Sequence, residues 1–377
     1  MPENLVYLGT YTEHAPNASK GIYAAKFDPA TGKLSTPTLV AELENPSFVA
    51  VSHDRRFLYA VSEVGTADAT GKKTGFVAAY SIGTGGKLTP LNRVPSNGAD
   101  PCHISVSRSG RTVAVANYTG GSTVSYLVKP DGSLGAITTD QHVGHGPNKE
   151  RQEAAHAHSA NFANDDHLLL SCDLGADAVY MYRTDDAKGS IAPRRPASVH
   201  VEPGSGPRHL AIHPSARYVY VINELTNTIG VFAFDPSKGT LVQRQSISTL
   251  PLGTTVANST AEIVVHPNGR FVYGSNRGHD SIAVFSVDAR DGRLTALGHT
   301  PTGGKAPRSF AIDPSGRWLL AANQLSNNIN SFAIDPQKGT LTPSGATLAV
   351  AKPVCVLFVF VPEVRGPLRP SDGIEGV

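Results

Sequence analysis

A turn-forming stretch that ends in Gly, one further residue and then Leu or Ile recurs seven times along the chain. The copies are Gly32-Lys33-Leu34, Gly86-Lys87-Leu88, Gly132-Ser133-Leu134, Gly189-Ser190-Ile191, Gly239-Thr240-Leu241, Gly292-Arg293-Leu294 and Gly339-Thr340-Leu341, and successive glycines are 46 to 57 residues apart. A repeat of this length built on strand, turn and strand is typical of a β-propeller, in which each repeat forms one blade. The repeats are therefore predicted to form one domain rather than a row of separate ones.

A second turn signal precedes the copies of the first. It is clearest at residues 213–217, 266–270 and 313–317, where Pro, Asn, Asp and Gly supply the backbone angles of tight turns. Short runs rich in Val, Ile and Tyr flank these turns, such as residues 217–222 and 229–234, and their length and β-branching favour strands over helices. Each repeat is predicted to be a blade of four antiparallel strands, named a to d from the channel outward.

The two ends of the chain are predicted to share one blade. Residues 5–10 align with strand b of another repeat, residues 271–276, so strand a of the first blade must come from residues 354–360. Pairing both ends in one sheet closes the ring and leaves no open sheet edge. The prediction is an all-β, seven-bladed β-propeller over residues 1–361, closed three plus one, with a disordered tail at residues 362–377.

The charge balance argues against several classes of partner. The 377 residues carry 33 Lys and Arg against 31 Asp and Glu, a net charge of +2, with no basic run that could follow a phosphate backbone. Nucleic acid is not expected as a partner, and neither is a membrane, because no apolar run approaches bilayer length. Residues 1–4 show no secretory leader. The three cysteines, Cys102, Cys172 and Cys355, are an odd number placed in or beside core strands. We expect a cytoplasmic protein with buried thiols, as a monomer or weak homodimer.

Blade alignment brings polar residues to one mouth of the central channel. Strand a starts at the rim where strand b ends, because b runs back along a. The aligned starts of strand a are Ser47, Cys102, His158, Arg208, Ala261, Arg308 and Val354. The aligned ends of strand b are Thr10-Tyr11, Ser62-Glu63, Asn117-Tyr118, Asp173-Leu174, Asn223-Glu224, Asn276-Arg277 and Asn323-Gln324. One rim is thus predicted to gather His158, Arg208, Arg308, Arg277, Glu224 and Glu63, flanked by His103, His209 and Glu262.

Such a rim could also be an ordinary solvated surface. Asn117, Asn276 and Asn323 fit that interpretation, because Asn at the end of a strand readily caps its own turn. Three arginines at one mouth are harder to explain in this way when the net charge is only +2. The forked guanidinium suits phosphate and carboxylate groups. A small anionic molecule is therefore the predicted occupant.

One connection between blades is longer than the others and carries histidines. Residues 141–156 lead into His156-Ala157-His158, and long loops on a rigid scaffold commonly carry function. A His-x-His pair in an extended segment can supply two metal ligands, because alternate residues point the same way. No Cys or Asp cluster accompanies the pair, so acid-base or hydrogen-bonding roles are favoured and no metal is predicted.

Several segments resemble the lactonase propeller family, which contains the cycloisomerase-type 6-phosphogluconolactonases and the fungal carboxy-cis,cis-muconate cyclases. The resemblance covers residues 4–361, and its most specific segments are Arg151-Gln152, His156-Ala157-His158-Ser159, Gly206-Pro207-Arg208-His209, Asn223-Glu224-Leu225, Ala261-Glu262-Ile263 and Ser275-Asn276-Arg277-Gly278-His279-Asp280. It implies catalytic roles for His158, Arg208, Glu224 and Arg277. The same rim is expected to supply substrate contacts from Arg308, His103, His156, His209, Gln152, Glu262 and Asn276. The chain departs from the family at Ala155, where Pro often precedes the His-x-His pair.

The reaction that the resemblance implies is hydrolysis of a sugar-acid lactone without a cofactor, with 6-phosphogluconolactone of the pentose phosphate pathway as the expected substrate. Water must lose a proton as it attacks the ring carbonyl, and the oxygen that gathers negative charge must be stabilised. Either Glu224 or His158 can be the base, although nearby arginines would lower the pKa of the carboxyl and weaken it. Arg208 and Arg277 would hold the anionic group of the substrate and the oxyanion.

Two other functions remain open at this point. Muconate cycloisomerisation on the same fold would also use an acid-base group together with arginines that bind carboxylates. A non-enzymatic interaction platform is the usual role of WD-type rings, but those carry repeated Trp-Asp signatures and this chain has a single Trp, Trp318.

Overall fold

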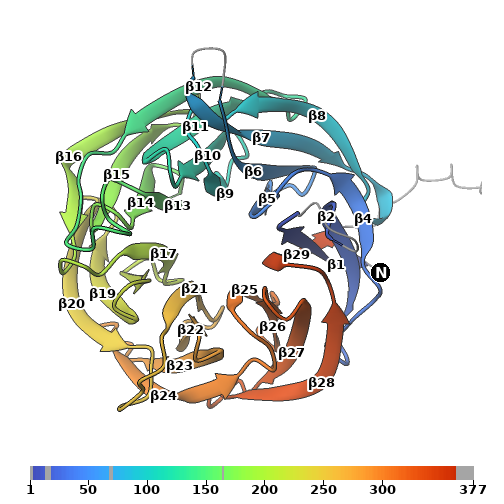
Figure 1. Ribbon diagram of the computed structural model, residues 1–377, viewed down its shortest axis with the longest axis vertical. Coiled ribbons are helices and arrows are strands. Elements are labelled where there is room, and N and C mark those ends of the chain that lie inside the picture. The colour runs from blue at the N-terminus through green and yellow to red at the C-terminus, as the bar shows by residue number, and fades with distance from the viewer. Residues whose placement is uncertain (1–2, 13–17, 68–70, 164, 362–377) are drawn as a thin grey trace, which may run out of the picture.

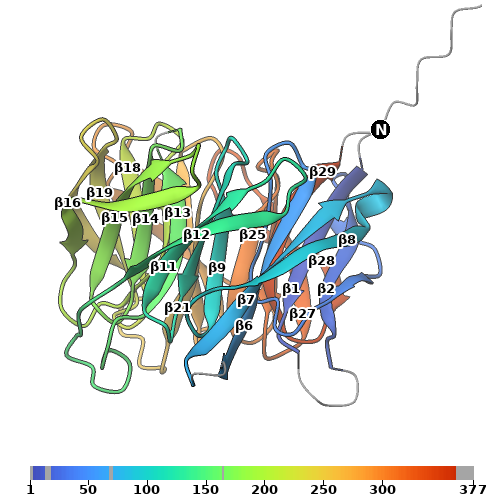
Figure 2. The same cartoon turned by 90° about the horizontal axis from the view of Figure 1, so that it is seen from above.

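Seven antiparallel sheets stand around a central channel in the computed structural model, which describes residues 3–12, 18–67, 71–163 and 165–361. The first strand of each blade lines the channel and the last lies at the outside (Figure 1). Figure 2 shows the sheets on edge around the ring, with their connections gathered at its two faces. The predicted all-β, seven-bladed propeller is confirmed. Within the described ranges, no helix is long and apolar enough to cross a membrane.

The seven blades have the following strands. Blade 1 holds β29 (Pro353–Val361), β1 (Glu3–Thr10) and β2 (Gly21–Asp28), with β3 (Lys33–Leu34) and β4 (Thr38–Glu42) sharing its outer edge. Blade 2 holds β5 (Val49–Val51), β6 (Phe57–Ala67), β7 (Lys73–Ile82) and β8 (Leu88–Pro95), with the 3-10 helix η1 (Thr84–Gly86) between the last two. Blade 3 holds β9 (Pro101–Val106), β10 (Thr112–Asn117), β11 (Ser122–Val128) and β12 (Leu134–Gln141). Blade 4 holds β13 (Ala157–Ala163), β14 (Leu168–Asp173), β15 (Ala178–Asp185) and β16 (Ser190–His200).

The remaining three blades repeat this pattern. Blade 5 holds β17 (Pro207–Ile212), β18 (Tyr218–Asn223), β19 (Thr228–Asp235) and β20 (Thr240–Ser248). Blade 6 holds β21 (Ser259–Val265), β22 (Phe271–Arg277), β23 (Ser281–Val287) and β24 (Leu294–Pro301). Blade 7 holds β25 (Pro307–Ile312), β26 (Trp318–Asn323), β27 (Asn328–Ile334) and β28 (Leu341–Ala349).

The ring closes as the sequence predicts. β1 pairs antiparallel with β29, from Leu5 opposite Val359 to Thr10 opposite Pro353, and β1 also pairs with β2. Blade 1 is therefore built from both ends of the chain, three strands plus one. The predicted tail at residues 362–377 lies outside the described residues.

The hydrophobic core lies between neighbouring blades rather than at the centre of the ring. Leu170 and Val179 of blade 4, for example, form one buried cluster with Val219 and Phe232 of blade 5. Comparable clusters join other neighbouring blades. Because each blade buries its two faces against its neighbours, the apolar burial that stabilises one blade depends on the presence of the next.

The repeated glycine explains the turn signal that marks each blade. All seven of these glycines have positive φ, between 60° and 86°, which glycine adopts without strain. A Cβ at Gly132 would overlap the ring of Phe57 in the preceding blade, and one at Gly292 would overlap Tyr218. The Tyr220 hydroxyl also donates a hydrogen bond to the Gly292 carbonyl, 3.0 Å between oxygens. The glycine is where one blade docks on the blade before it.

This docking predicts that a methyl group added at Gly292 destabilises the ring more than one added at a free turn. Gly110 is the matched control, because its φ of 75° is close to the 77° of Gly292 but a Cβ there meets no atom within 4 Å. We expect Gly110→Ala to cost about 1 to 2 kcal/mol from backbone strain alone. Gly292→Ala should cost about 1 to 3 kcal/mol more because it also overpacks the interface between blades. The measurement is urea unfolding of both variants, and equal losses would contradict the docking role.

Candidate active site

A β-bulge lies at the rim end of strand a in several blades. The pairing of β9 with β10 passes from Pro101 opposite Asn117 to His103 opposite Ala116, so the residue between them is left unpaired. The residues left unpaired in this way in β9, β13, β17, β25 and β29 are Cys102, His158, Arg208, Arg308 and Val354. A bulge re-aims the side chain of the extra residue. Each bulged residue is one that blade alignment predicts at the start of strand a.

Three arginines converge on the carboxylate of Glu224, which follows β18. Arg208 donates from Nε to Oε2 at 2.9 Å, and Arg277 lies 3.0 Å from the same oxygen through Nη2. Arg151 donates from Nη2 to Oε1 at 2.7 Å. Burial would raise the pKa of Glu224, but the charges of Arg277, Arg208 and Arg151 outweigh it and lower the pKa to about 2. Glu224 is therefore an ionised anchor for the arginines and a weak base.

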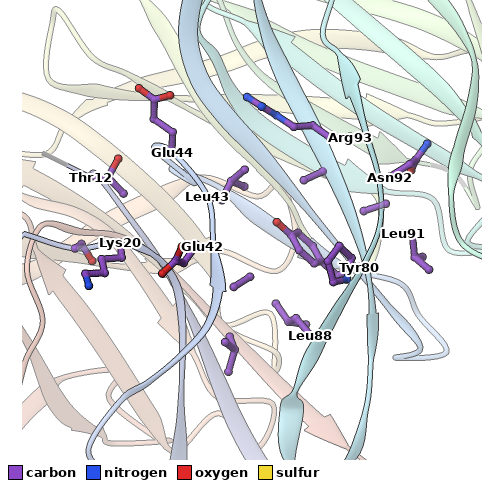
Figure 3. A pocket seen from close by; sticks show the side chains of 16 residues that line it. Thr12, Lys20, Glu42, Leu43, Glu44, Tyr80, Leu88, Leu91, Asn92 and Arg93 are labelled. Carbon is purple, nitrogen blue, oxygen red and sulfur yellow. The ribbon is translucent and has the colours of Figure 1, made fainter. Parts of the chain in front are cut away.

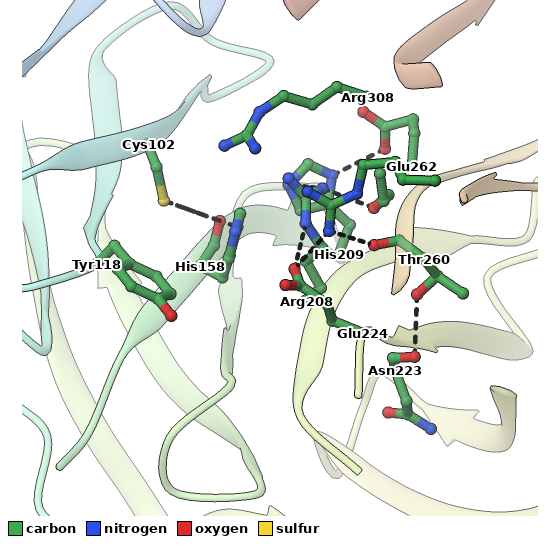
Figure 4. A network of polar contacts seen from close by, with 12 residues as sticks. Cys102, Tyr118, His158, Arg208, His209, Asn223, Glu224, Thr260, Glu262 and Arg308 are labelled. Atoms are coloured by element: carbon green, nitrogen blue, oxygen red, sulfur yellow. Dashed lines mark hydrogen bonds and ion pairs between the residues drawn. The ribbon is translucent and has the colours of Figure 1, made fainter. Parts of the chain in front are cut away.

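His158 lies beside this cluster in a buried position (Figure 4). Its Nδ1 is 3.7 Å from the Cys102 sulfur, and the edge of its ring meets the Tyr118 ring with centroids 5.4 Å apart. Burial, reinforced by the charges of Arg208 and Arg308, holds the pKa of His158 well below its usual value. No described residue forms a hydrogen bond with its Nε2. A neutral imidazole with a free nitrogen is thus present at the mouth.

The long connection before blade 4 folds against this rim. Gln152 is fully buried, donates from Nε2 to the Leu174 carbonyl at 2.9 Å and accepts at Oε1 from the Asn148 backbone. His156 stacks on Tyr118, with ring centroids 4.6 Å apart, and both of its ring nitrogens have hydrogen-bond partners within the protein. These contacts hold the loop so that Arg151 reaches Glu224. We therefore reassign Gln152 from substrate contact to scaffold.

His103, His209 and Glu262 form a second row below the rim. His209 accepts at Nε2 from Nη1 of Arg208 at 3.3 Å, so its other nitrogen, Nδ1, carries the proton and donates to Oε1 of Glu262 at 2.8 Å (Figure 4). Burial raises the pKa of Glu262 to about 7 and lowers those of both histidines well below their usual value. The three side chains border a cavity of about 430 Å³ whose other walls are mostly apolar residues of the strands that line the channel. His209 and Glu262 thus support Arg208 from below.

The asparagines at the ends of strand b belong to the scaffold. Asn276 is fully buried, accepts at Oδ1 from the Thr249 hydroxyl and donates from Nδ2 to the Thr249 carbonyl, each at 2.8 Å. Asn117 and Asn323 likewise donate to a carbonyl of the connection that enters their own blade. The expectation of a substrate contact from Asn276 is therefore wrong, because its amide is used within the blade.

On the other side of the mouth, Arg308 contacts Tyr11, which in turn contacts Glu63. Sequence analysis did not link these residues. Arg308 donates from Nη2 to the Tyr11 hydroxyl at 2.9 Å, and that hydroxyl donates to Oε1 of Glu63, also at 2.9 Å. The strand that carries Glu63 runs further than predicted, because β6 pairs with β7 again at Thr66 after a register shift. Arg308 also borders a small space in the channel together with Cys102 and Arg208.

The arrangement can bind and polarise an anionic ester. It combines three clustered arginines, a further arginine across the mouth and a neutral imidazole in largely buried surroundings, where charge interactions are strong. Among the described residues, no group of three or more His, Cys, Asp and Glu side chains is placed to hold a metal ion. All three cysteines are free and buried, and burial raises the pKa of Cys102, so a thiolate nucleophile is not favoured.

A groove of about 950 Å³ lies away from the rim, on the outer side of blades 1 and 2. It runs between β4 and the strands β7 and β8, and its labelled charges, Lys20, Glu42, Glu44 and Arg93, are of both signs (Figure 3). Mixed charges at an exposed surface do not concentrate an anion in the way the rim arginines do. The rim is therefore the better candidate for catalysis.

Sequence reasoning missed Arg151 and Tyr118 as members of the site. Arg151 crosses from the long loop to Glu224 and also donates from Nη2 to the Tyr118 hydroxyl at 3.3 Å. The position of Arg151 in the long loop, next to Gln152, was the available signal. Tyr118 was aligned at the end of strand b but given no role.

Comparison with known proteins shows what the whole chain is similar to. The family model described as lactonase, 7-bladed β-propeller matches residues 5–358. A 6-phosphogluconolactonase of Bacillus subtilis is 38% identical over 95% of this chain and 99% of its own length. Another, from Formosa agariphila, is 35% identical over 81% of this chain and 85% of its own. The structure of a periplasmic gluconolactonase from Pseudomonas aeruginosa has a TM-score of 0.88 at 34% identity and covers 96% of this chain and all of its own.

The binding of three arginines to Glu224 predicts a pH-dependent loss of stability. The pKa of Glu224 is about 2 in the folded chain against 4.5 for the free group. Its ionised carboxylate therefore stabilises the folded state by about 3 kcal/mol above pH 4.5, and this stabilisation is lost as the pH falls towards 2. Glu224→Gln should be less stable than the wild type at pH 7, and this difference should shrink on acidification. The measurement is denaturant unfolding at pH 7, 4.5 and 3. Glu202→Gln, at an exposed site, is the control and should show no such change.

Proposed function

The chain belongs to the seven-bladed β-propeller lactonases, and on that premise we propose that its rim hydrolyses 6-phospho-D-glucono-1,5-lactone to 6-phosphogluconate. The observation that carries the proposal is the placement of a neutral, buried His158 beside arginines that Glu224 holds in place. The names of the Bacillus subtilis and Formosa agariphila relatives support the same substrate. Because these relatives are lactone hydrolases by name, hydrolysis is preferred to cycloisomerisation and to a non-catalytic platform.

His158 is the base that takes a proton from water in this proposal. A base must be unprotonated at neutral pH, and burial keeps His158 in that state. Glu224 is the weaker of the two candidates, because both of its oxygens are bound by arginines. Deprotonated water then attacks the lactone carbonyl carbon and forms a tetrahedral oxyanion.

The arginines bind the phosphate group and the oxyanion in this proposal. Arg208 is held at Nε and Nη1, so its Nη2 remains to donate to substrate, and the buried Nε of Arg277 has no partner among the described residues. Arg308 adds a positive charge across the mouth. Glu224 fixes Arg208 and Arg277, and Tyr11 holds Arg308, before substrate arrives, so little reorganisation is needed when charge develops.

The cellular setting follows from the proposed substrate. The chain would act in the pentose phosphate pathway of the cytoplasm, and the three free, buried cysteines fit a reducing compartment. We propose a monomer or weak homodimer without a nucleic-acid partner, in keeping with the net charge of +2.

Replacing an arginine by lysine tests the forked recognition. Arg208→Lys and Arg277→Lys keep the charge but lose the fork, so each should lower kcat/KM on the phosphorylated lactone by about 10- to 1000-fold. Arg290→Lys is the control, because Arg290 is exposed and its side chain pairs with Asp288 at the surface. Glucono-1,5-lactone should be measured in parallel: a smaller loss there assigns that arginine to the phosphate, and an equal loss assigns it to the oxyanion. Unchanged kinetics in both variants would place the site elsewhere.

Acid-base catalysis by side chains predicts that metal chelation has no effect on the rate and that replacing His158 lowers it. Exhaustive treatment with EDTA should leave the rate on 6-phosphogluconolactone unchanged, and His158→Ala should lower kcat by about 100-fold or more. Circular dichroism and thermal unfolding of the variant establish that it is folded. Loss of activity on chelation that added divalent metal restores would contradict this mechanism and make His156 and His158 candidate ligands.

A further inference from the structure

The three arginines that bind Glu224 lie on two sides of its carboxylate. Arg208 and Arg277 contact Oε2, at 2.9 and 3.0 Å, whereas Arg151 contacts Oε1 at 2.7 Å. The two sides also differ in burial, because the side chain of Arg208 is 2% exposed and that of Arg277 15%, but that of Arg151 is 40% exposed. Within this cluster, Arg151 is therefore the arginine that solvent and an incoming anion reach most easily.

Arg151 has hydrogen-bond donors to spare. A guanidinium carries N–H groups on each of its nitrogens and accepts nothing. Nη2 is the nitrogen that contacts Glu224 and Tyr118. No described residue forms a hydrogen bond with the Nε or the Nη1 of Arg151, so the N–H groups on these two atoms remain for a ligand.

The loop that carries Arg151 is held near both of its ends by one buried carboxylate. Nδ1 of His142 lies 2.6 Å from Oδ2 of Asp173, and the backbone N–H of His156 donates to Oδ1 of the same residue at 2.8 Å. The side chain of Gln152, which follows Arg151, is fully buried and hydrogen-bonded. The guanidinium is thus placed before a ligand arrives, and this lowers the entropy lost on binding.

Tyr118 connects Arg151 to the base of the proposed reaction. The Tyr118 hydroxyl accepts from Arg151 at 3.3 Å, and the Tyr118 ring meets the His158 ring with centroids 5.4 Å apart (Figure 4). Arg151 is therefore one tyrosine side chain away from His158. A substrate that is attacked beside His158 can extend towards Arg151 with another part of its structure.

The proposed substrate has two ends that make different demands on a cationic site. In 6-phosphogluconolactone, the carbonyl that reacts and the phosphate are at opposite ends of the sugar. Charge on the carbonyl oxygen develops only during the reaction, and buried donors stabilise it best. A phosphate is charged throughout, and its removal from water is costly. The buried side of the Glu224 cluster therefore suits the carbonyl, and the exposed side suits the phosphate.

We infer that Arg151 recognises the phosphate group and sets the preference of the rim for a phosphorylated over an unphosphorylated sugar lactone, a role that rests on the proposed lactone hydrolysis. Nε and Nη1 of Arg151 donate to phosphate oxygens, while Nη2 stays on Glu224 and Tyr118. Arg208 and Arg277 are then left for the carbonyl end of the substrate.

Arg151→Gln tests this role through the ratio of two rates. With spontaneous hydrolysis subtracted, kcat/KM on 6-phosphogluconolactone should fall about 100-fold more than kcat/KM on glucono-1,5-lactone, mostly through KM. Both rates should fall to some extent, because Glu224 loses a partner. Arg151→Lys keeps the charge and should recover part of the ratio. Lys149→Gln is the matched control, because it removes the same charge from an exposed position of the same loop, and it should leave the ratio unchanged.

Titration with the reaction product tests Arg151 without turnover. In isothermal titration calorimetry, the wild type should bind 6-phosphogluconate about 10-fold or more tightly than gluconate, and Arg151→Gln should lose most of this difference. Thermal unfolding establishes that the variant is folded. Equal falls of both rates in Arg151→Gln, or an unchanged difference in the titration, would overturn the role of Arg151. Absence of turnover of both lactones by the wild type would instead overturn the proposed function.

Discussion

The docking of each repeated glycine turn on the preceding blade is the contact on which the rest of this molecule depends. The turn approaches closely because glycine has no side chain, and in several blades a buried tyrosine closes the contact by donating to the glycine carbonyl. Seven such contacts fix the angle between neighbouring blades, and that angle sets the width of the channel. The distances between rim side chains from different blades therefore depend on contacts at the outer part of the sheets.

At the rim, one carboxylate organises three positive charges. Arg208, Arg277 and Arg151 come from blade 5, blade 6 and the loop before blade 4, and they would repel one another without Glu224. Removing a partner from such a buried cluster leaves uncompensated charge, which is far more costly than losing a surface pair. The carboxylate is thus a structural requirement for an anion site, and this explains why Glu224, one of the two base candidates from the sequence, is a poor base.

Much of the fold and of the rim was predictable from the sequence, because aligned residues of a repeat occupy equivalent places in their blades. The turn signals gave the blades, and alignment placed His158, Arg208 and Arg308 at one mouth. The bulges were not predicted, although in four of the five bulged strands a proline, at Pro101, Pro207, Pro307 and Pro353, directly precedes the bulged residue. Contacts that cross between blades, such as Arg151 with Glu224, could not be predicted either. These contacts depend on how a long loop packs, and alignment of the repeats carries no information about that packing.

The three-plus-one closure has a consequence for how the protein is made. β1 leaves the ribosome before β29, its partner, which lies about 340 residues further along the chain, so at ~5–20 residues per second β1 waits roughly 17 to 70 s for it. During that time the open edge of β1 can pair with other chains. Tyr11, which follows β1, contacts Arg308 of the last blade. The rim is therefore completed only after blade 7 and β29 have been made, and until then β1 keeps an open edge.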